Sequence, residues 1–268
     1  MDLELNGHVA IVTGGASGIG LACARGLARE GCGIALWDFS PQVNDAASSI
    51  AADFGQTHPL QVDVRDYAAV GAAVRATEAA LGPVSHVVHA AAVGSGKYGF
   101  PFTNLEPRDW RPVLESNVLG MVHVAQAVAA GMVARKEGTM VFIGSVAGQI
   151  GSQTDPPYSA SKAAGINFAQ CLAKDLAAHN IRVNTVNPGM VRTPLNRQVW
   201  QAWHEQQPRE QRRSYEEWAG DKVRAVAPLG RWQGAEDIAD MVVFLSSARA
   251  NQVTGQTINV DGGQVMHW

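Results

Sequence analysis

Charge and cysteine are both scarce in this chain, and each scarcity excludes a class of protein. Only 17% of the 268 residues are charged, and the formal net charge is −3. Proteins that bind nucleic acid usually present a strongly basic surface, so no nucleic-acid partner is predicted. The densest basic stretch, residues 208–213, is interrupted by Glu210 and Gln211 and is typical of a solvated helix face.

The three cysteines, Cys23, Cys32 and Cys171, are widely spaced and form no CxxC pair. An odd number of scattered thiols provides neither a disulfide framework nor the ligand spacing of a zinc site. The sequence therefore predicts no metal centre, and it favours a reducing, cytoplasmic setting.

Long apolar runs are missing as well. The opening residues, MDLELNGHVAIVTGG, lack the basic segment of a signal peptide and carry only a short apolar run. A membrane-spanning helix needs about 20 consecutive apolar residues. The nearest candidate, residues 120–133, is interrupted by His123 and Gln126 and is interpreted as a buried helix. No membrane association is predicted.

Glycine and apolar residues are abundant instead, with 28 glycines and an apolar fraction of 46%. Apolar strands alternate with helices along the chain, which is the pattern of a parallel α/β sheet covered on both faces. Right-handed crossovers then give a doubly wound sheet. The predicted strands are 8–14, 33–38, 59–64, 86–91, 138–145, 181–189 and 256–263. The predicted helices are 18–30, 41–54, 66–81, 107–135, 158–178 and 235–247.

The whole chain, 1–268, is predicted to form one catalytic domain, because no linker, repeat or low-complexity stretch divides it. One region, 192–228, departs from the alternation after the sixth predicted strand. It is polar and rich in Trp, Gln, Arg and Glu. We interpret it as a helical insert that forms a lid over the substrate.

The segment TGGASGIG, residues 13–20, follows the first predicted strand and opens the first predicted helix. Gly14, Gly18 and Gly20 allow a tight turn and a close approach of the backbone to a ligand. The helix N-terminus then offers free N–H groups to a pyrophosphate. Glycine loops also arise for packing alone, but the strand–turn–helix context favours a dinucleotide-binding turn.

Asp38 ends the second predicted strand, 18 residues after Gly20. A carboxylate near this spacing hydrogen-bonds the ribose hydroxyls of NAD and repels the 2′-phosphate of NADP. No Arg or Lys lies within the glycine turn or directly after Asp38, so NAD is the predicted cofactor. The alternative is that Asp38 only caps the helix that follows.

Tyr158 and Lys162 stand four residues apart in the stretch PYSASKAAG, residues 157–165. Side chains at i and i+4 share one face of a helix. A free tyrosine titrates near pH ~10, too high for a base at neutral pH, and a lysine charge beside it favours the phenolate. A chance pair on an exposed helix is the alternative. Combined with the dinucleotide turn, the pair is interpreted as an acid/base.

The segments TGGASGIG, GSVAG with Ser145, and YSASK resemble the motifs of the short-chain dehydrogenase/reductase family, from the first strand to the final VDGG. The resemblance implies a single Rossmann-type domain, a nicotinamide cofactor and hydride transfer between an alcohol and a carbonyl. It makes Tyr158 the catalytic acid/base, Lys162 the residue that lowers its pKa and binds the nicotinamide ribose, and Ser145 the donor to the substrate oxygen. Asn117, in ESNVLG, resembles the residue that holds a water in a proton relay with the lysine.

The resemblance also implies the cofactor contacts. Asp63 and Val64 are expected to flank the adenine ring, and Val191 and Thr193, in the loop 187–193, to meet the nicotinamide carboxamide. The full set of predicted contacts is Gly14, Ser17, Gly18, Ile19, Gly20, Asp38, Asp63, Val64, Ala90, Tyr158, Lys162, Pro188, Gly189, Val191 and Thr193.

One stretch departs from the family pattern. Where the family usually has Asn-Asn-Ala-Gly after the fourth strand, this chain has HAAA, residues 89–92. His89 takes the place of an asparagine that commonly ties the sheet together, and its ring nitrogens are expected to do similar work. Ala92 adds a methyl group where the cofactor passes, which puts the local geometry in doubt.

The substrate pocket is expected to be lined by 94–102, 146–157 and the insert. Its polar residues, Gln149, Ser152, Gln153 and Asp155, favour a hydroxylated substrate, because leaving them unpaired is costly. The predicted reaction is the oxidation of a secondary alcohol in a small polyol, sugar or hydroxy acid. Trp200 and Trp203 either close over the substrate or pack the insert onto the protein.

Two other functions stay open. A 3-oxoacyl thioester reductase of the same family is the close alternative, although Asp38 and the negative balance of charge count against it. A dinucleotide-sensing protein without turnover is the other, and the intact Ser145, Tyr158 and Lys162 count against that. The resemblance further implies a homodimer or homotetramer through the helices at 107–135 and 158–178, with Trp268 inserted into a neighbouring subunit as a hypothesis.

Overall fold

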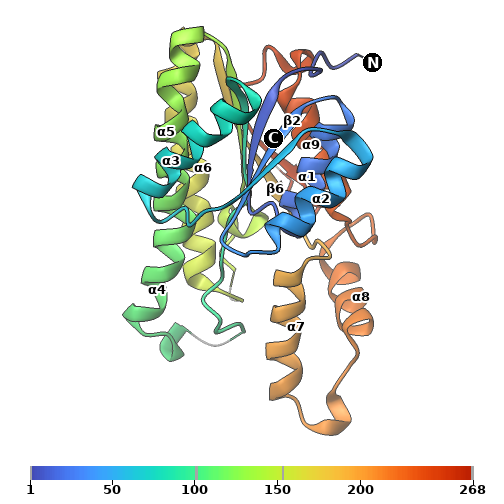
Figure 1. Ribbon diagram of the computed structural model, residues 1–268. Coiled ribbons are helices and arrows are strands. Elements are labelled where there is room, and N and C mark those ends of the chain that lie inside the picture. Colours follow the sequence, from blue (N-terminus) through green and yellow to red (C-terminus); the bar gives the residue numbers. More distant parts are fainter. Residues whose placement is uncertain (1, 100–101, 153, 267–268) are drawn as a thin grey trace.

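A parallel sheet forms the centre of the protein. A computed structural model describes residues 2–99, 102–152 and 154–266. Its strands are β1 (Val9–Thr13), β2 (Gly33–Asp38), β3 (Thr57–Gln61), β4 (Val84–His89), β5 (Gly138–Ile143), β6 (Ile181–Pro188) and β7 (Thr257–Val260). In these residues they pair in the order β3-β2-β1-β4-β5-β6-β7, all parallel (Figure 1). The predicted doubly wound α/β sheet is confirmed.

Helices cover both faces of the sheet. They are α1 (Gly18–Arg29), α2 (Val43–Phe54), α3 (Tyr67–Leu81), α4 (Pro107–Leu114), α5 (Gly120–Arg135), α6 (Pro156–Leu176), α7 (Pro194–Gln206), α8 (Tyr215–Val226) and α9 (Ala235–Ser246). Helices α1, α2 and α9 share one apolar core with the sheet, and α3, α5 and α6 share the other. The two cores lie on opposite faces, as the crossovers of a doubly wound sheet require (Figure 1).

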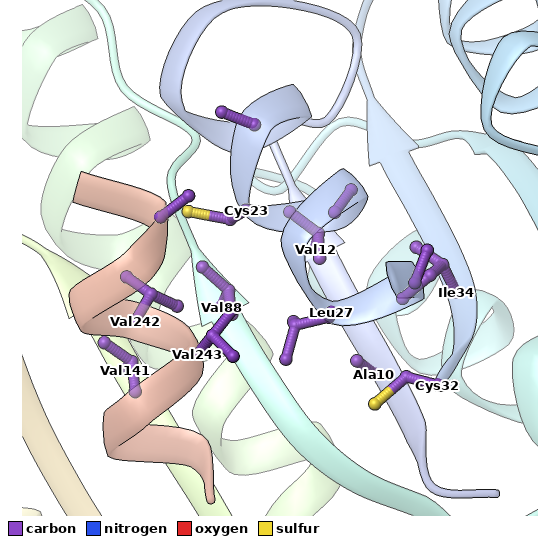
Figure 2. Packing of buried hydrophobic residues seen from close by; sticks show 14 of the residues in the cluster. Ala10, Val12, Cys23, Leu27, Cys32, Ile34, Val88, Val141, Val242 and Val243 are labelled. Carbon is purple, nitrogen blue, oxygen red and sulfur yellow. The ribbon is translucent and has the colours of Figure 1, made fainter. Parts of the chain in front are cut away.

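Small side chains let α1 and α9 lie close together on the first face. A Cβ added at Gly26 of α1 would come within 3.0 Å of a Val243 methyl carbon, so this glycine sets the spacing of the two helices. Figure 2 shows the side chains that fill the layer between these helices and the sheet. Those labelled there include Val12, Cys23, Leu27, Val88, Val141, Val242 and Val243.

The third strand is displaced from its predicted place. It runs over Thr57–Gln61 instead of 59–64, because β2 ends at Asp38 and Asp38 pairs with Gln61. Beyond Gln61 there is no partner strand to continue the ladder. Asp63 and Val64 therefore follow the strand end and face the groove described below.

The long predicted helix 107–135 is divided by a π-helical turn, Glu115–Leu119, between α4 and α5. A π turn inserts an extra residue into a helix and frequently marks a functional site. It brings Ser116 and Asn117 into the interior. By length and composition, residues Pro107–Arg135 would also pass as a membrane span, since an 18-residue window within them has a mean hydropathy of 1.5. His123 and Gln126 therefore do not by themselves distinguish this segment from a membrane span. In the structure its α5 part packs against α3 and β4.

The polar region after β6 folds into α7 and α8, which project from one end of the body (Figure 1). Trp200 packs edge-on against Tyr215, and Trp203 lies 6.3 Å from Trp218, ring centre to ring centre. Both tryptophans therefore join α7 to α8. Neither lines the substrate pocket in the described residues, so closure over the substrate by these two rings is not what the structure shows.

Candidate active site

The carboxyl ends of β1, β4, β5 and β6 open on the same edge of the sheet, and β1 and β4 flank the point where the strand order reverses. Ligands of open α/β sheets bind at such switch points. A groove of about 700 Å³ lies here. Twelve predicted cofactor contacts line it: Gly14, Ser17, Gly18, Ile19, Gly20, Asp38, Asp63, Val64, Ala90, Tyr158, Lys162 and Thr193. The other three, Pro188, Gly189 and Val191, line the smaller pocket that adjoins it.

The glycine turn is shaped for a close backbone approach. A Cβ on Gly20 would lie 2.1 Å from the carbonyl oxygen of Gly14, and one on Gly14 would lie 2.9 Å from the backbone of Ala90. Ser17 precedes α1 without a side-chain cap, and no acidic residue stands in the first turn. The N–H groups of that turn therefore remain available for the pyrophosphate of a dinucleotide. The contacts themselves stay predictions.

Backbone donors hold Asp38 at the end of β2. One carboxylate oxygen accepts a hydrogen bond from Ala16 N at 3.0 Å, and the other accepts one from Ser40 N at 2.8 Å. These bonds fix the carboxylate beside the glycine turn. Each oxygen keeps a further lone pair that a ribose hydroxyl can use.

No Arg or Lys lies directly after Asp38 in the sequence, but a cation from another part of the chain lines the same groove in the fold. In the fold, Arg65 lines the same groove and forms an ion pair with Asp63 at 2.6 Å. Hydrogen bonds from Arg65 hold the pKa of the Asp63 carboxyl below its usual range. The guanidinium also lies 5.8 Å from the ring centre of Phe39. In the sequence, Arg65 is visible as a cation directly after Asp63 and Val64. That it lines the same groove as Asp38 depends on the order of the strands in the sheet.

Ser145, Tyr158 and Lys162 meet at the end of β5. The Ser145 hydroxyl accepts a hydrogen bond from Ala147 N at 3.1 Å, and it lines the same pocket as the Tyr158 phenol. Lys162 Nζ donates to the carbonyl of Ile143 at 2.6 Å and lies 5.4 Å from the centre of the Tyr158 ring. The structure thus brings three of the four predicted catalytic residues into one cluster, in which Lys162 is buried and the other two are half-buried.

The acidity of this cluster differs from the sequence expectation. Desolvation raises the pKa of Tyr158 to about 12, and the neighbouring Ser145 hydroxyl only partly offsets this rise. The charge of Asp155 and the phenol of Tyr98 raise it further. Burial also lowers the pKa of Lys162 to about 8. These protein groups therefore keep the Tyr158 phenol protonated at neutral pH. The sequence analysis predicted that Lys162 would lower the pKa of Tyr158, but the effect of desolvation is larger.

Asn117 is held by the protein on both ends of its amide. Nδ2 donates to Val93 O and to Ser161 Oγ, each at 2.9 Å, and Oδ1 accepts from Val93 N at 2.8 Å. The side chain therefore ties the loop after β4 to helix α6, which carries Tyr158 and Lys162. Its part in a water relay with the lysine stays a prediction.

His89 links neighbouring strands, as the sequence predicts. Its Nδ1 is 3.0 Å from Thr13 Oγ1 on β1, and the same hydroxyl accepts a hydrogen bond from Ala91 N. Burial, followed by the charge of Lys162, lowers the pKa of His89 to about 3. The ring is therefore neutral, and it does the sheet-tying work of the asparagine it replaces. Ala92 lines the groove beside it.

Replacing His89 by asparagine is expected to make the protein less sensitive to mild acid. The pKa of His89 falls from 6.5 to about 3 on folding, so between these pH values the unfolded chain binds a proton that the folded chain does not. Stability therefore falls as the pH drops below 6.5. Urea titrations at pH 7 and pH 5 should show about 2 kcal/mol less acid loss in the variant. Equal losses in both proteins would contradict the neutral, buried ring.

A pocket of about 190 Å³ adjoins the groove at Tyr158 and Ser145. Of the polar residues predicted to line it, Ser152 and Asp155 do, Gln149 lines a neighbouring surface pocket, and Gln153 lies outside the described residues. Five further lining residues come from the three segments predicted to form the pocket, although the sequence did not single them out: Tyr98, Thr154, Leu195, Asn196 and Val199. Which residues of each segment line the pocket depends on how the loop after β4 and helix α7 fold over β5.

Among residues 2–99, 102–152 and 154–266, no group of three or more His, Cys, Asp or Glu side chains is placed to hold a metal ion. The polar and charged side chains named in the site are hydroxyls, a lysine and carboxylates.

Comparisons with known proteins agree with this site. Residues 14–265 match the family model described as enoyl-(acyl carrier protein) reductase. The chain is 32% identical to the 2,3-dihydro-2,3-dihydroxybenzoate dehydrogenase of Bacillus subtilis, covering 98% of this chain and 97% of that protein. It is also 32% identical to the 3-oxoacyl-[acyl-carrier-protein] reductase of Thermotoga maritima, covering 98% and 100%.

A solved structure extends the likeness to the fold. The L-sorbose reductase of Gluconobacter frateurii, complexed with NADPH and L-sorbose, superposes with a TM-score of 0.91 at 30% identity, over 100% of both chains. By their names, the two relatives and the sorbose reductase act on different carbonyl or hydroxyl compounds. They therefore agree on the type of reaction and differ on substrate.

Proposed function

The chain belongs to the short-chain dehydrogenase/reductase family, and on this premise we propose that it is an NAD-dependent oxidoreductase acting on a secondary alcohol of a small polyol, sugar or hydroxy acid. One observation carries the proposal. Ser145 and Tyr158 stand together where a small, partly polar pocket meets the dinucleotide groove. When bound there, a nicotinamide dinucleotide supplies the hydride acceptor.

The side chains of the cluster divide the remaining work. The Tyr158 oxygen takes the proton from the substrate hydroxyl during oxidation and returns it during reduction. The Ser145 hydroxyl donates a hydrogen bond where negative charge develops on the substrate oxygen. Lys162 supplies a buried positive charge near the ring, and that charge acts most strongly where water is excluded.

The preference for NAD is argued from Asp38. Its carboxylate is held by Ala16 N and Ser40 N at the adenosine end of the groove, where a 2′-phosphate would meet a like charge. Arg65 is the nearby cation that could offset this repulsion, but it is paired with Asp63. The similar sorbose reductase was solved with NADPH, so the choice of NAD over NADP rests on Asp38 and not on that likeness.

Reduction of a 3-oxoacyl thioester is the second candidate, favoured by the similarity to the Thermotoga protein. The pocket counts against it. Ligand sites for drug-sized molecules have volumes of about 300–1,000 Å³, whereas this one measures about 190 Å³ and has a buried carboxylate, Asp155, in its wall. A sensor without turnover is disfavoured by the assembled Ser145–Tyr158–Lys162 cluster.

We further propose that residues 192–228 act as a lid on a single catalytic domain. The first two turns of α7 support this, because Leu195, Asn196 and Val199 line the pocket. The three free thiols, Cys23, Cys32 and Cys171, are consistent with the proposed cytoplasmic setting.

Assembly into a homodimer or homotetramer is expected through helices α4 to α6. Leu114 and Leu119, at the π-helical turn, are 37% and 49% exposed, and an apolar surface of this kind supports a subunit contact. Trp268 lies outside the described residues. Light scattering should give a mass two or four times 28.4 kDa, and a mass near 28.4 kDa would remove this proposal.

The proposed function is tested by initial rates of cofactor reduction with sorbitol, xylitol, lactate and isopropanol, each with NAD and with NADP. Turnover of a hydroxylated compound with NAD is the expected result. Reduction of an oxoacyl thioester by NADPH is measured alongside. Activity on the thioester alone would replace the proposal by the second candidate.

A further inference from the structure

Asp155 is a buried carboxylate with one unpaired oxygen in the wall of the substrate pocket. The residue is 4% exposed. Its Oδ2 accepts a hydrogen bond from Ser95 N at 2.9 Å, whereas its Oδ1 is buried without a hydrogen-bond partner. Tyr98, Ser145 and Tyr158 line the same pocket. A buried, unpaired carboxylate oxygen is costly, so this wall is built to receive a donor.

Asp155 does not cap the helix that it precedes. It stands at the N-cap of α6, where an aspartate commonly binds the N–H groups of its own helix. Here the side chain makes no such bond. The two residues that follow, Pro156 and Pro157, have no N–H to offer. The carboxylate turns instead toward Ser95, in the loop after β4.

The opposing loop is shaped to admit this carboxylate. A Cβ on Gly94 would lie 2.5 Å from the Tyr98 hydroxyl and 2.8 Å from Asp155 Oδ2. A residue with a side chain would therefore push both groups out of the wall. Tyr158 follows Asp155 by three positions, in the first turn of α6. Asp155 and the proposed acid/base thus line one small pocket.

We propose that Asp155 binds substrate by accepting a hydrogen bond from a hydroxyl on the carbon next to the reacting carbinol, which selects vicinal diols of polyols and sugars over hydroxy acids. This inference rests on the proposed function and narrows it. A neighbouring hydroxyl satisfies Oδ1, a methyl group leaves it unpaired, and a carboxylate brings a second negative charge against it.

Three secondary alcohols of equal carbon number test the inference, since they differ only in the neighbouring group. Isopropanol carries a methyl group there, propylene glycol a hydroxymethyl group, and lactate a carboxylate. The wild type should favour propylene glycol over isopropanol by about 10- to 100-fold in kcat/KM with NAD. Asp155→Asn should lose most of this preference and gain about tenfold on lactate. Any change in the acidity of Tyr158 affects all three alike and cancels in the ratios.

Asp155→Asn keeps an oxygen for Ser95 N, so it preserves the loop contact while removing the charge. Asp109→Asn is the matched control. Asp109 binds Lys97 Nζ at 2.7 Å and so holds the same loop from outside the pocket, and this variant should keep the wild-type ratios. Where the three alcohols are not turned over, their inhibition constants against sorbitol are compared in the same way.

The outcomes separate the two proposals. An Asp155→Asn variant that loses activity equally on all three compounds, or keeps the preference for the diol, would show that Asp155 only supports the fold. Absence of any turnover by the wild type, on these alcohols and on sorbitol, would instead remove the proposed function and this inference with it.

Discussion

Replacing Tyr158 by phenylalanine is expected to lower kcat/KM for alcohol oxidation by about 10³-fold, within the usual range for the loss of a positioned acid/base. The phenol lines the pocket beside Ser145, and Lys162 Nζ lies 5.4 Å from the centre of its ring. The ring itself is kept by phenylalanine, so binding of NADH, followed by fluorescence, should change by less than about tenfold.

The matched control for this variant is Tyr67→Phe, which removes a phenol that is 50% exposed at the start of α3. It should keep the wild-type rate. If Tyr158→Phe retained more than about a tenth of the wild-type kcat/KM, another group would have to carry the proton. Asp155 would then be the first candidate, because it shares the pocket.

Replacing Asp38 by alanine is expected to raise the ratio of NADP to NAD efficiency by about 100-fold. The wild-type carboxylate accepts hydrogen bonds from ribose hydroxyls and repels a 2′-phosphate, and a like-charge contact costs several kcal/mol. Each 1.4 kcal/mol corresponds to about tenfold in affinity. Steady-state kinetics with both cofactors, on one alcohol, measure the ratio.

Two companions sharpen this test. Asp45→Ala, on the exposed side of α2, removes a carboxylate outside the groove and should leave the ratio unchanged. Adding Arg65→Ala to Asp38→Ala should reverse part of the gain for NADP, because Arg65 is a cation that lines the groove with Asp38. A ratio unmoved by Asp38→Ala would mean that this carboxylate does not face the adenosine ribose.

Local signals in the sequence were enough for the parts of the site that local geometry builds. Gly14 and Gly20 belong to one strand–turn–helix segment, and Tyr158 and Lys162 belong to one helix, so short-range spacing places them. The apolar alternation likewise predicts the sheet, because buried parallel strands and covering helices differ in their periods. His89 is a further success, since its bond to Thr13 follows from its place on β4.

Features that depend on distant segments were missed for a physical reason. Arg65 and Asp38 line one groove only because β3 lies beside β2, and Asp155 and Tyr98 line one pocket only because the loop after β4 folds onto α6. The pKa of Tyr158 was expected to be low from its lysine neighbour, but desolvation by the surrounding protein raises it instead. Burial is a property of the whole fold, so no spacing in the chain reports it.

The central claim is that this site oxidises a secondary alcohol with NAD. The most direct measurement is product analysis after incubation of the protein with NAD and sorbitol, with magnetic resonance for the sugar and absorbance for the reduced cofactor. The account predicts a ketose, formed in the same amount as NADH. An aldose, which would come from a primary alcohol, would contradict the claim, as would no sugar product beside rapid reduction of an oxoacyl thioester by NADPH.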